Sequence, residues 1–72
     1  MKTSGYITTK RKCNNHVVIK GNCNGYDFDY SYLALDGESV DDTLKRIRKE
    51  MMLEKFRLEK RLNAVRLAYI QD

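Results

Sequence analysis

The pair Asn24-Gly25 constrains the fold of this chain more than any other feature of its sequence. Asn-Gly is the strongest short-range hairpin signal, because both residues tolerate the positive φ angles of a type I′ turn. Counting outward from this turn places Cys23 opposite Tyr26 and Gly21 opposite Phe28, where the ring covers the missing side chain. The sequence therefore predicts two antiparallel strands over residues 16–21 and 26–35.

The predicted pairing also separates side chains by polarity. One face is apolar and aromatic, and two further pairs complete it: Ile19 with Tyr30 and Val17 with Tyr32. The other face is polar and carries three pairs: Asn22 with Asp27, Lys20 with Asp29, and Val18 with Ser31. Because side chains alternate along a strand, a shift of one residue would mix the two sets, so the separation supports this register.

A further strand is predicted over residues 6–12, and its register has two alternatives. A two-residue turn at Asn14-Asn15 would place on the core face Tyr6, Thr8, Lys10 and Lys12. A three-residue loop through His16 would place there Ile7, Thr9, Arg11 and Cys13. We prefer the loop, because it buries an isoleucine and leaves both lysines in solvent.

The chain after Gly37 contains no glycine or proline and is rich in helix formers. Ser39 and Asp42 have the spacing of a helix N-cap and its partner, with acids where the helix dipole favours them. Apolar residues then follow helical spacing, and several are eleven apart: Val40, Leu44, Ile47, Met51, Leu58, Leu62, Val65 and Tyr69. Others widen this stripe: Met52, Leu53, Phe56, Leu67 and Ile70. We expect a helix over about residues 40–70.

Such a helix would be about 50 Å long, whereas strands of seven residues span only about 23 Å. Its distal apolar residues therefore need another cover: Leu58, Leu62, Val65, Leu67, Tyr69 and Ile70. Either the helix breaks near residues 60–63 and folds back, or it pairs with a second copy. Because no glycine or proline breaks it, we expect a homodimer through the distal helix. The predicted class is α+β, a single domain over residues 1–72 with a three-stranded antiparallel meander and one long C-terminal helix.

The formal charge of +4 conceals three blocks of alternating sign. Residues 1–25 carry five bases and no acid, residues 26–42 six acids and no base, and residues 43–72 nine bases and four acids. No stretch approaches the roughly 18 apolar residues of a membrane span, and residues 1–12 lack the apolar core of a secretory signal. We therefore expect an intracellular, cytoplasmic protein whose polarised charge suits a binding role.

Residue patterns for catalysis are weak. Cys13, His16 and Cys23 supply three potential zinc ligands, but a structural site needs four, and no Cys-x-x-C pair is present. Asp27 and Asp29 lie on one strand face beside Lys20, which is a solvated arrangement rather than an acid-base pair. We therefore predict a non-enzyme with no metal and no cofactor.

One binding hypothesis is DNA, contacted through the basic side chains of the hairpin and the helix: Lys10, Arg11, Lys12, Lys20, Lys45, Arg46, Arg48 and Lys49. The run from Gly5-Tyr6-Ile7 through Asn24-Gly25-Tyr26 to residues 39–44 resembles, in the order of its elements, the N-terminal domains of some tyrosine recombinases and the AP2 type. That resemblance covers about fifty residues and implies a sheet lying in the major groove. Asp27 and Asp29 depart from it, because acids on that face repel phosphates.

The preferred hypothesis is a small accessory or regulatory protein of the phage or mobile-element type, which binds and inhibits or redirects a host protein. This expectation rests on size class, on the alternating charge blocks and on the uncovered helix. The residues expected at protein interfaces come from the distal helix and the acidic strand: Leu58, Leu62, Val65, Tyr69, Asp27 and Asp29. Acidic side chains would suit a basic target surface.

Overall fold

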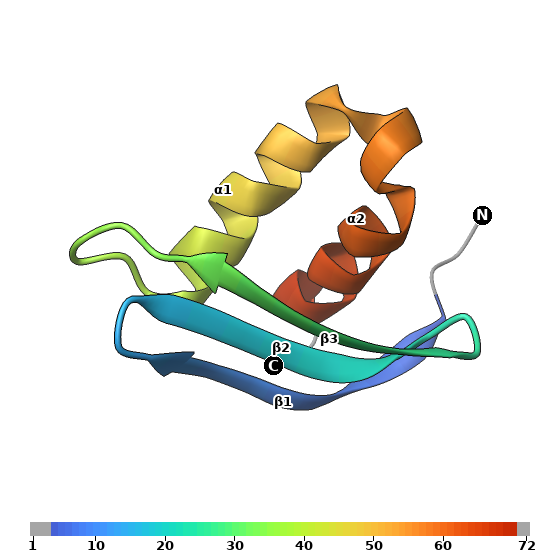
Figure 1. The fold of residues 1–72 in the computed structure, drawn as a ribbon, viewed down its shortest axis with the longest axis horizontal. Coiled ribbons are helices and arrows are strands. Elements are labelled where there is room, and N and C mark those ends of the chain that lie inside the picture. Colours follow the sequence, from blue (N-terminus) through green and yellow to red (C-terminus); the bar gives the residue numbers. More distant parts are fainter. Residues whose placement is uncertain (1–3, 71–72) are drawn as a thin grey trace.

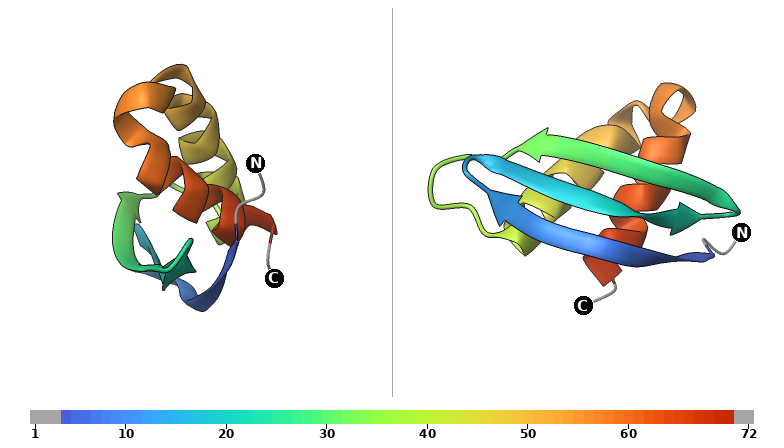
Figure 2. Two further views of the ribbon diagram at one scale, coloured as in Figure 1. Left: turned by 90° about the vertical axis from the view of Figure 1, so that its right-hand side faces the viewer. Right: turned by 60° about the horizontal axis from the view of Figure 1, so that its bottom comes forward.

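The computed structural model describes residues 4–70 as a three-stranded antiparallel sheet packed against two helices. The strands are β1 (Gly5–Cys13), β2 (His16–Cys23) and β3 (Tyr26–Leu33), with β2 in the middle. The helices are α1 (Val40–Leu53) and α2 (Lys55–Ile70), and both lie on the same face of the sheet (Figure 1). The opposite face is not covered by either helix (Figure 2). The α+β class is thus confirmed.

The β2–β3 hairpin has the predicted register. Asn24 and Gly25 form the turn with φ angles of 54° and 87°, and every pair counted from that turn is present. The apolar face points at the helices, where Val17 and Ile19 of β2 are fully buried with Tyr32 of β3. A local turn signal therefore determined the strand pairing at the centre of the sheet.

The preferred register of β1 was wrong. Cys13 pairs with His16, so Asn14 and Asn15 form a two-residue turn. This is the register that we had considered and not preferred. A β-bulge between Ile7 and Thr9 then shifts the alternation by one residue, so Ile7 still lies opposite Gly21 and packs on the core. Neither alternative included a bulge, and the bulge is why Ile7 shares the helix-facing side with lysines.

Those lysines are Lys10 and Lys12, which lie opposite Ile19 and Val17. The Lys10 ammonium donates a hydrogen bond to the carbonyl oxygen of Ala68 in α2, at 3.0 Å, and only 16% of its side chain is exposed. The Lys12 ammonium donates to the carbonyl oxygen of Glu38, at 2.7 Å. Because a lysine stem can cover apolar surface while its charged end reaches a polar partner, both lysines fit on the core side.

One long helix was also a wrong prediction, since the chain turns at Glu54. This residue has φ −121° and ψ 40°, and its N–H donates to the carbonyl oxygen of Met51. A second irregularity follows at Leu58, with φ −121° and ψ 22°, before α2 runs back over the sheet. The observed turn therefore comes earlier than residues 60–63, where a break had been considered.

Burial explains why the chain turns without glycine or proline. Folding back buries Leu62, Val65 and Leu67 almost completely, and each such side chain contributes about 1.5–3 kcal/mol. The helical hydrogen bonds lost at a turn are worth only about 1 kcal/mol each. Ala64 and Ala68 are fully buried, and their small side chains allow α2 to pack closely. The distal stripe is thus covered within one chain, which removes the sequence argument for a dimer.

The connection from β3 to α1 is organised by Glu38. Its carboxylate accepts hydrogen bonds from the Arg46 guanidinium, the Leu35 N–H and the Thr43 hydroxyl. These bonds, the one from Arg46 first, lower the pKa of Glu38 to about 2. The predicted N-cap follows directly, because the Ser39 hydroxyl accepts from the N–H of Asp42 at 3.2 Å.

Candidate functional site

Four aromatic side chains of β3 form a row on the face that points at the helices. They occupy alternate positions, which is why they share one side of the strand: Tyr26, Phe28, Tyr30 and Tyr32. The rings of Phe28 and Tyr30 are stacked, with centroids 5.7 Å apart and an interplanar angle of 14°. Exposure rises along the row, from 8% at Tyr32 to 70% at Tyr26. The row therefore begins in the core and ends in solvent.

Two bases of α2 lie against this aromatic row. The Lys60 ammonium is 5.4 Å from the centroid of the Tyr26 ring, and the Arg61 guanidinium carbon is 5.2 Å from that of Tyr30. Both distances lie within the range of cation–π attraction. Neither base was selected from the sequence, because adjacent helical residues lie about 100° apart around the helix axis and no signal indicated that both would reach β3.

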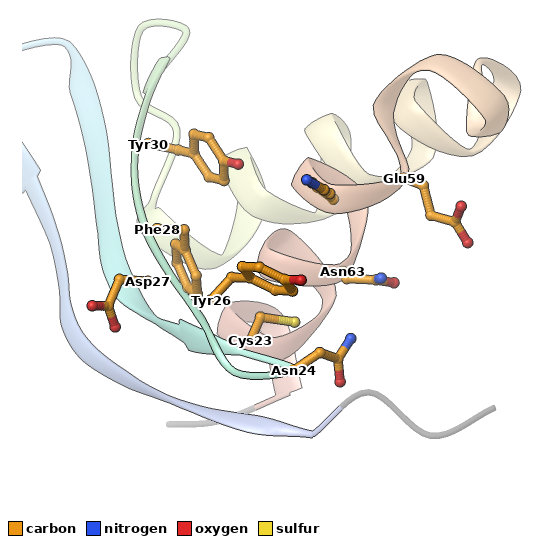
Figure 3. Close-up of a pocket in the computed structure, with 9 residues that line it drawn as sticks. Cys23, Asn24, Tyr26, Asp27, Phe28, Tyr30, Glu59 and Asn63 are labelled. Atoms are coloured by element: carbon orange, nitrogen blue, oxygen red, sulfur yellow. The ribbon is translucent and has the colours of Figure 1, made fainter.

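Between the open end of the row and α2 lies a cleft of about 440 Å³. We call it the β3–α2 cleft, and it is lined by Cys23, Asn24, Tyr26, Asp27, Phe28, Tyr30, Glu59, Lys60 and Asn63. In Figure 3 the ring of Tyr26 extends toward Asn63, whereas Asp27 points away from α2 and the Glu59 carboxylate points away from β3. The charge that faces the aromatic wall is consequently positive.

The Cys23 thiol lies in this cleft but lacks the surroundings of a nucleophile. Cys23 is only 8% exposed, and burial raises the pKa of its thiol. A raised pKa keeps the sulfur protonated at neutral pH, while nucleophilic attack and metal binding need the thiolate. Cys23 is therefore a poor candidate for a nucleophile or a metal ligand.

A second feature is a set of exposed apolar residues that are close together in the sequence where α1 meets α2. We call Met52, Leu53 and Phe56 the helix tip; they are 56%, 85% and 100% exposed. In the sequence these residues only widened the apolar stripe of a continuous helix. The turn at Glu54 instead places these residues at the junction of α1 and α2, at the end of the helices away from the sheet (Figure 1), which the sequence pattern did not show.

The bases proposed for DNA contact are not gathered on one face. Lys10 and Lys12 of β1 point toward the helices. Arg11, which lies between them, and Lys20 of β2 point to the uncovered face of the sheet. The Lys20 ammonium there lies 3.8 Å from the Asp29 carboxylate. With Asp27 also on this face, the two bases are balanced by two acids.

The helical bases of that set lie elsewhere. Arg46 is held by the Glu38 carboxylate and also donates to the carbonyl oxygen of Leu33, at 2.8 Å. The Arg48 guanidinium carbon lies 5.3 Å from the centroid of the Tyr69 ring. Lys45 and Lys49 are exposed on α1.

The residues expected at protein interfaces are also divided. Leu62 and Val65 are buried inside the single chain, and Leu58 and Tyr69 are half-buried against the same core. Asp27 and Asp29 are exposed at one edge of the sheet. The fold thus withdraws the centre of the predicted helical interface from solvent.

The three potential zinc ligands are not brought together. Cys13 and His16 flank the first turn, while Cys23 lies at the other end of β2, about 23 Å away at 3.3 Å per residue. Both cysteines are unpaired. Within residues 4–70, no three His, Cys, Asp or Glu side chains form a group that could hold a metal ion.

Comparison with other proteins gives no relative from which a role can be transferred. No protein family, curated protein or solved structure matches this chain. Neither described helix is long and apolar enough to cross a membrane. Function must therefore be argued from the residues themselves.

Proposed function

We propose that this chain is a non-enzymatic accessory protein that binds a protein partner through the helix tip. The observation that carries the proposal is the complete exposure of Phe56, three positions after Leu53, which is 85% exposed. Exposed apolar side chains that cluster, rather than occur singly, mark interaction surfaces. Aromatic side chains, phenylalanine included, are enriched at protein interfaces.

The surroundings of the helix tip support docking by a protein. Lys49, Glu50, Lys55 and Arg57 flank it in the sequence and are all exposed, so an apolar centre has a charged rim of both signs. Protein interfaces commonly have this arrangement, in which the centre excludes water and the rim remains hydrated. The tip is also presented by the ends of two helices, which limits the conformational entropy lost on binding.

Replacing Phe56 tests this proposal without unfolding the protein, because the exposed ring contributes little to the fold. Partners captured from the native cytoplasm by the wild-type chain should be retained by Leu35→Ala and lost by the double variant Leu53→Ala with Phe56→Ala. Leu35 is a matched control, since it is an apolar residue that is 55% exposed before α1 begins. With the purified partner, the double variant should weaken binding at least about tenfold.

The mass of the isolated protein in solution shows whether the partner is a second copy of this chain or a different protein. A dimer that is lost in the double variant would make the partner a second copy of the chain, whereas a monomer leaves a different protein. Equal binding of the purified partner by the wild-type chain and the double variant would contradict docking at the helix tip.

A further inference from the structure

The β3–α2 cleft combines three chemical features that the helix tip lacks. Its wall is aromatic, the charge facing that wall is cationic, and neutral amides stand at one end. These features belong to other residues than Met52, Leu53 and Phe56, so the cleft is a separate candidate binding site.

The aromatic wall presents a flat surface for stacking. Tyr26 is 70% exposed, although it lies on the side of β3 that faces the helices, and Phe28 beside it is half-buried. Nucleobases stack on tyrosine and phenylalanine rings because each presents an extended π face.

The charge of the cleft favours an anion. Lys60 extends over the Tyr26 ring from α2, and Arg61 does the same over Tyr30. The two nearby acids, Asp27 and Glu59, point out of the space between β3 and α2 (Figure 3). A phosphate group beside Lys60 would meet a cation without an opposing carboxylate directed at it.

The amides of Asn24 and Asn63 supply donors and acceptors of the type that base edges require. Asn24 is held in place, since its Oδ1 accepts a hydrogen bond from the N–H of Ser4 at 3.1 Å. The volume of about 440 Å³ lies within the roughly 300–1,000 Å³ of small-ligand sites.

We propose that the β3–α2 cleft binds a nucleotide unit, with its base against Tyr26 and its phosphate beside Lys60. The unit is either a free nucleotide or one residue of a single strand, since both present the same base and phosphate. A base in an intact duplex is stacked on both faces and does not fit this arrangement. The proposal does not depend on the helix tip, and the two can fail separately.

The test is a titration followed by backbone amide chemical shifts, with adenosine monophosphate, adenosine, ribose 5-phosphate and inorganic phosphate as separate probes. We expect saturable shifts at Tyr26 and Asn63 with the nucleotide, at a dissociation constant near or below about 1 mM. Adenosine and ribose 5-phosphate should each bind more weakly. Equal binding of the nucleotide, ribose 5-phosphate and inorganic phosphate would overturn the proposal, as would the absence of saturable shifts.

Matched variants identify the two contacts. Tyr26→Ala should weaken nucleotide binding about tenfold, while Tyr6→Ala, at an exposed tyrosine on the opposite face of the sheet, should not. Lys60→Gln should weaken binding of the nucleotide but not of adenosine, and Lys45→Gln should change neither. The amide spectra of the four variants report folding directly. Unchanged nucleotide binding in both folded cleft variants would overturn the proposal.

A last arm distinguishes the two sources of the ligand. A hexanucleotide of adenine that binds at least about tenfold more tightly than the monophosphate, and loses this gain in Tyr26→Ala, assigns the cleft to a single strand. Equal affinity of the hexanucleotide and the monophosphate assigns it to a free nucleotide. Hexanucleotide binding that is insensitive to Tyr26→Ala would place the strand elsewhere and count against the cleft.

Discussion

The ammonium group of Lys10 donates a hydrogen bond to the carbonyl oxygen of Ala68, 3.0 Å away. This contact joins β1 to the last turn of α2, where unpaired carbonyls and the helix dipole attract a cation. The same ammonium lies 3.9 Å from the carboxylate of Asp41 in the first turn of α1. One lysine on the helix-facing side of the sheet therefore contacts both helices.

Replacing Lys10 should destabilise the fold. Lys10→Met keeps an apolar stem but removes the charge, and we expect the free energy of unfolding to fall by about 1–3 kcal/mol. Arg11→Met is the control, because Arg11 is the next residue of β1 and is exposed on the opposite face; it should change stability by less than about 0.5 kcal/mol. Urea denaturation measures both, and equal midpoints for the two variants would contradict a structural role of Lys10.

The Glu38 carboxylate should make stability depend on pH in acid. Its pKa falls from an ordinary 4.5 to about 2, chiefly because Arg46 donates hydrogen bonds to it. A carboxyl group with a lowered folded-state pKa stabilises the fold above its unfolded pKa, and this stability is lost as the pH falls through the folded value. We therefore expect a contribution that is complete above pH 4.5 and declines toward pH 2.

Thermal unfolding between neutral pH and pH 2 measures this effect. Glu38→Gln should lower the melting temperature at neutral pH and flatten its decline in acid, because the titrating group is gone. Glu59→Gln, at an exposed position of α2, should leave the profile unchanged. Parallel profiles for the wild-type chain and Glu38→Gln would show that Glu38 is not the group responsible.

Gly21 should tolerate no side chain, because β1 crosses it closely at the bulge. A Cβ atom there would lie 2.2 Å from the carbonyl oxygen of Tyr6, which is backbone and moves only with the strand. We expect Gly21→Ala to reduce the free energy of unfolding by about 3 kcal/mol or more. Gly25→Asn is the control, since its site is open and asparagine is among the residues that best tolerate the positive φ; it should cost only about 1–2 kcal/mol. Similar losses for the two variants would be inconsistent with this close approach.

Duplex DNA should bind only weakly to the uncovered face of the sheet. Arg11 and Lys20 on that face are balanced by Asp27 and Asp29. Titration with random duplex from about 50 to 200 mM salt tests this, because phosphate contacts make affinity fall steeply over that range. Tight binding at low salt that Arg11→Ala with Lys20→Ala weakens would instead support the DNA hypothesis.

Several parts of the fold followed from short segments of the chain. Asn24-Gly25 determined the β2–β3 register because the φ angles of two adjacent residues set which strand positions meet. Ser39 began α1 because its hydroxyl reaches an N–H three residues away. The apolar spacing also identified the buried faces of both helices, for example at Leu44 and Val65.

The two candidate sites could not be predicted from the sequence. The aromatic row of β3 was correctly placed on the inner face, but its partners Lys60 and Arg61 come from α2 after the chain has turned. Phe56 was grouped with core residues, because its spacing fits the same stripe until the helix breaks. A site assembled from two elements needs their relative positions, which local patterns do not contain.

The sequence by itself determined the strands, the central register, the N-cap and the apolar faces, since each depends on residues close together in the chain. Only the tertiary structure decided the bulge before Thr9, the inward lysines and the turn at Glu54. Local propensity favours a continuous helix through Glu54. The short sheet nevertheless gains more from burying Leu62 and Val65 than the helix loses in hydrogen bonds at the turn. That balance exists only when the whole chain is packed together, and it creates both the helix tip and the β3–α2 cleft.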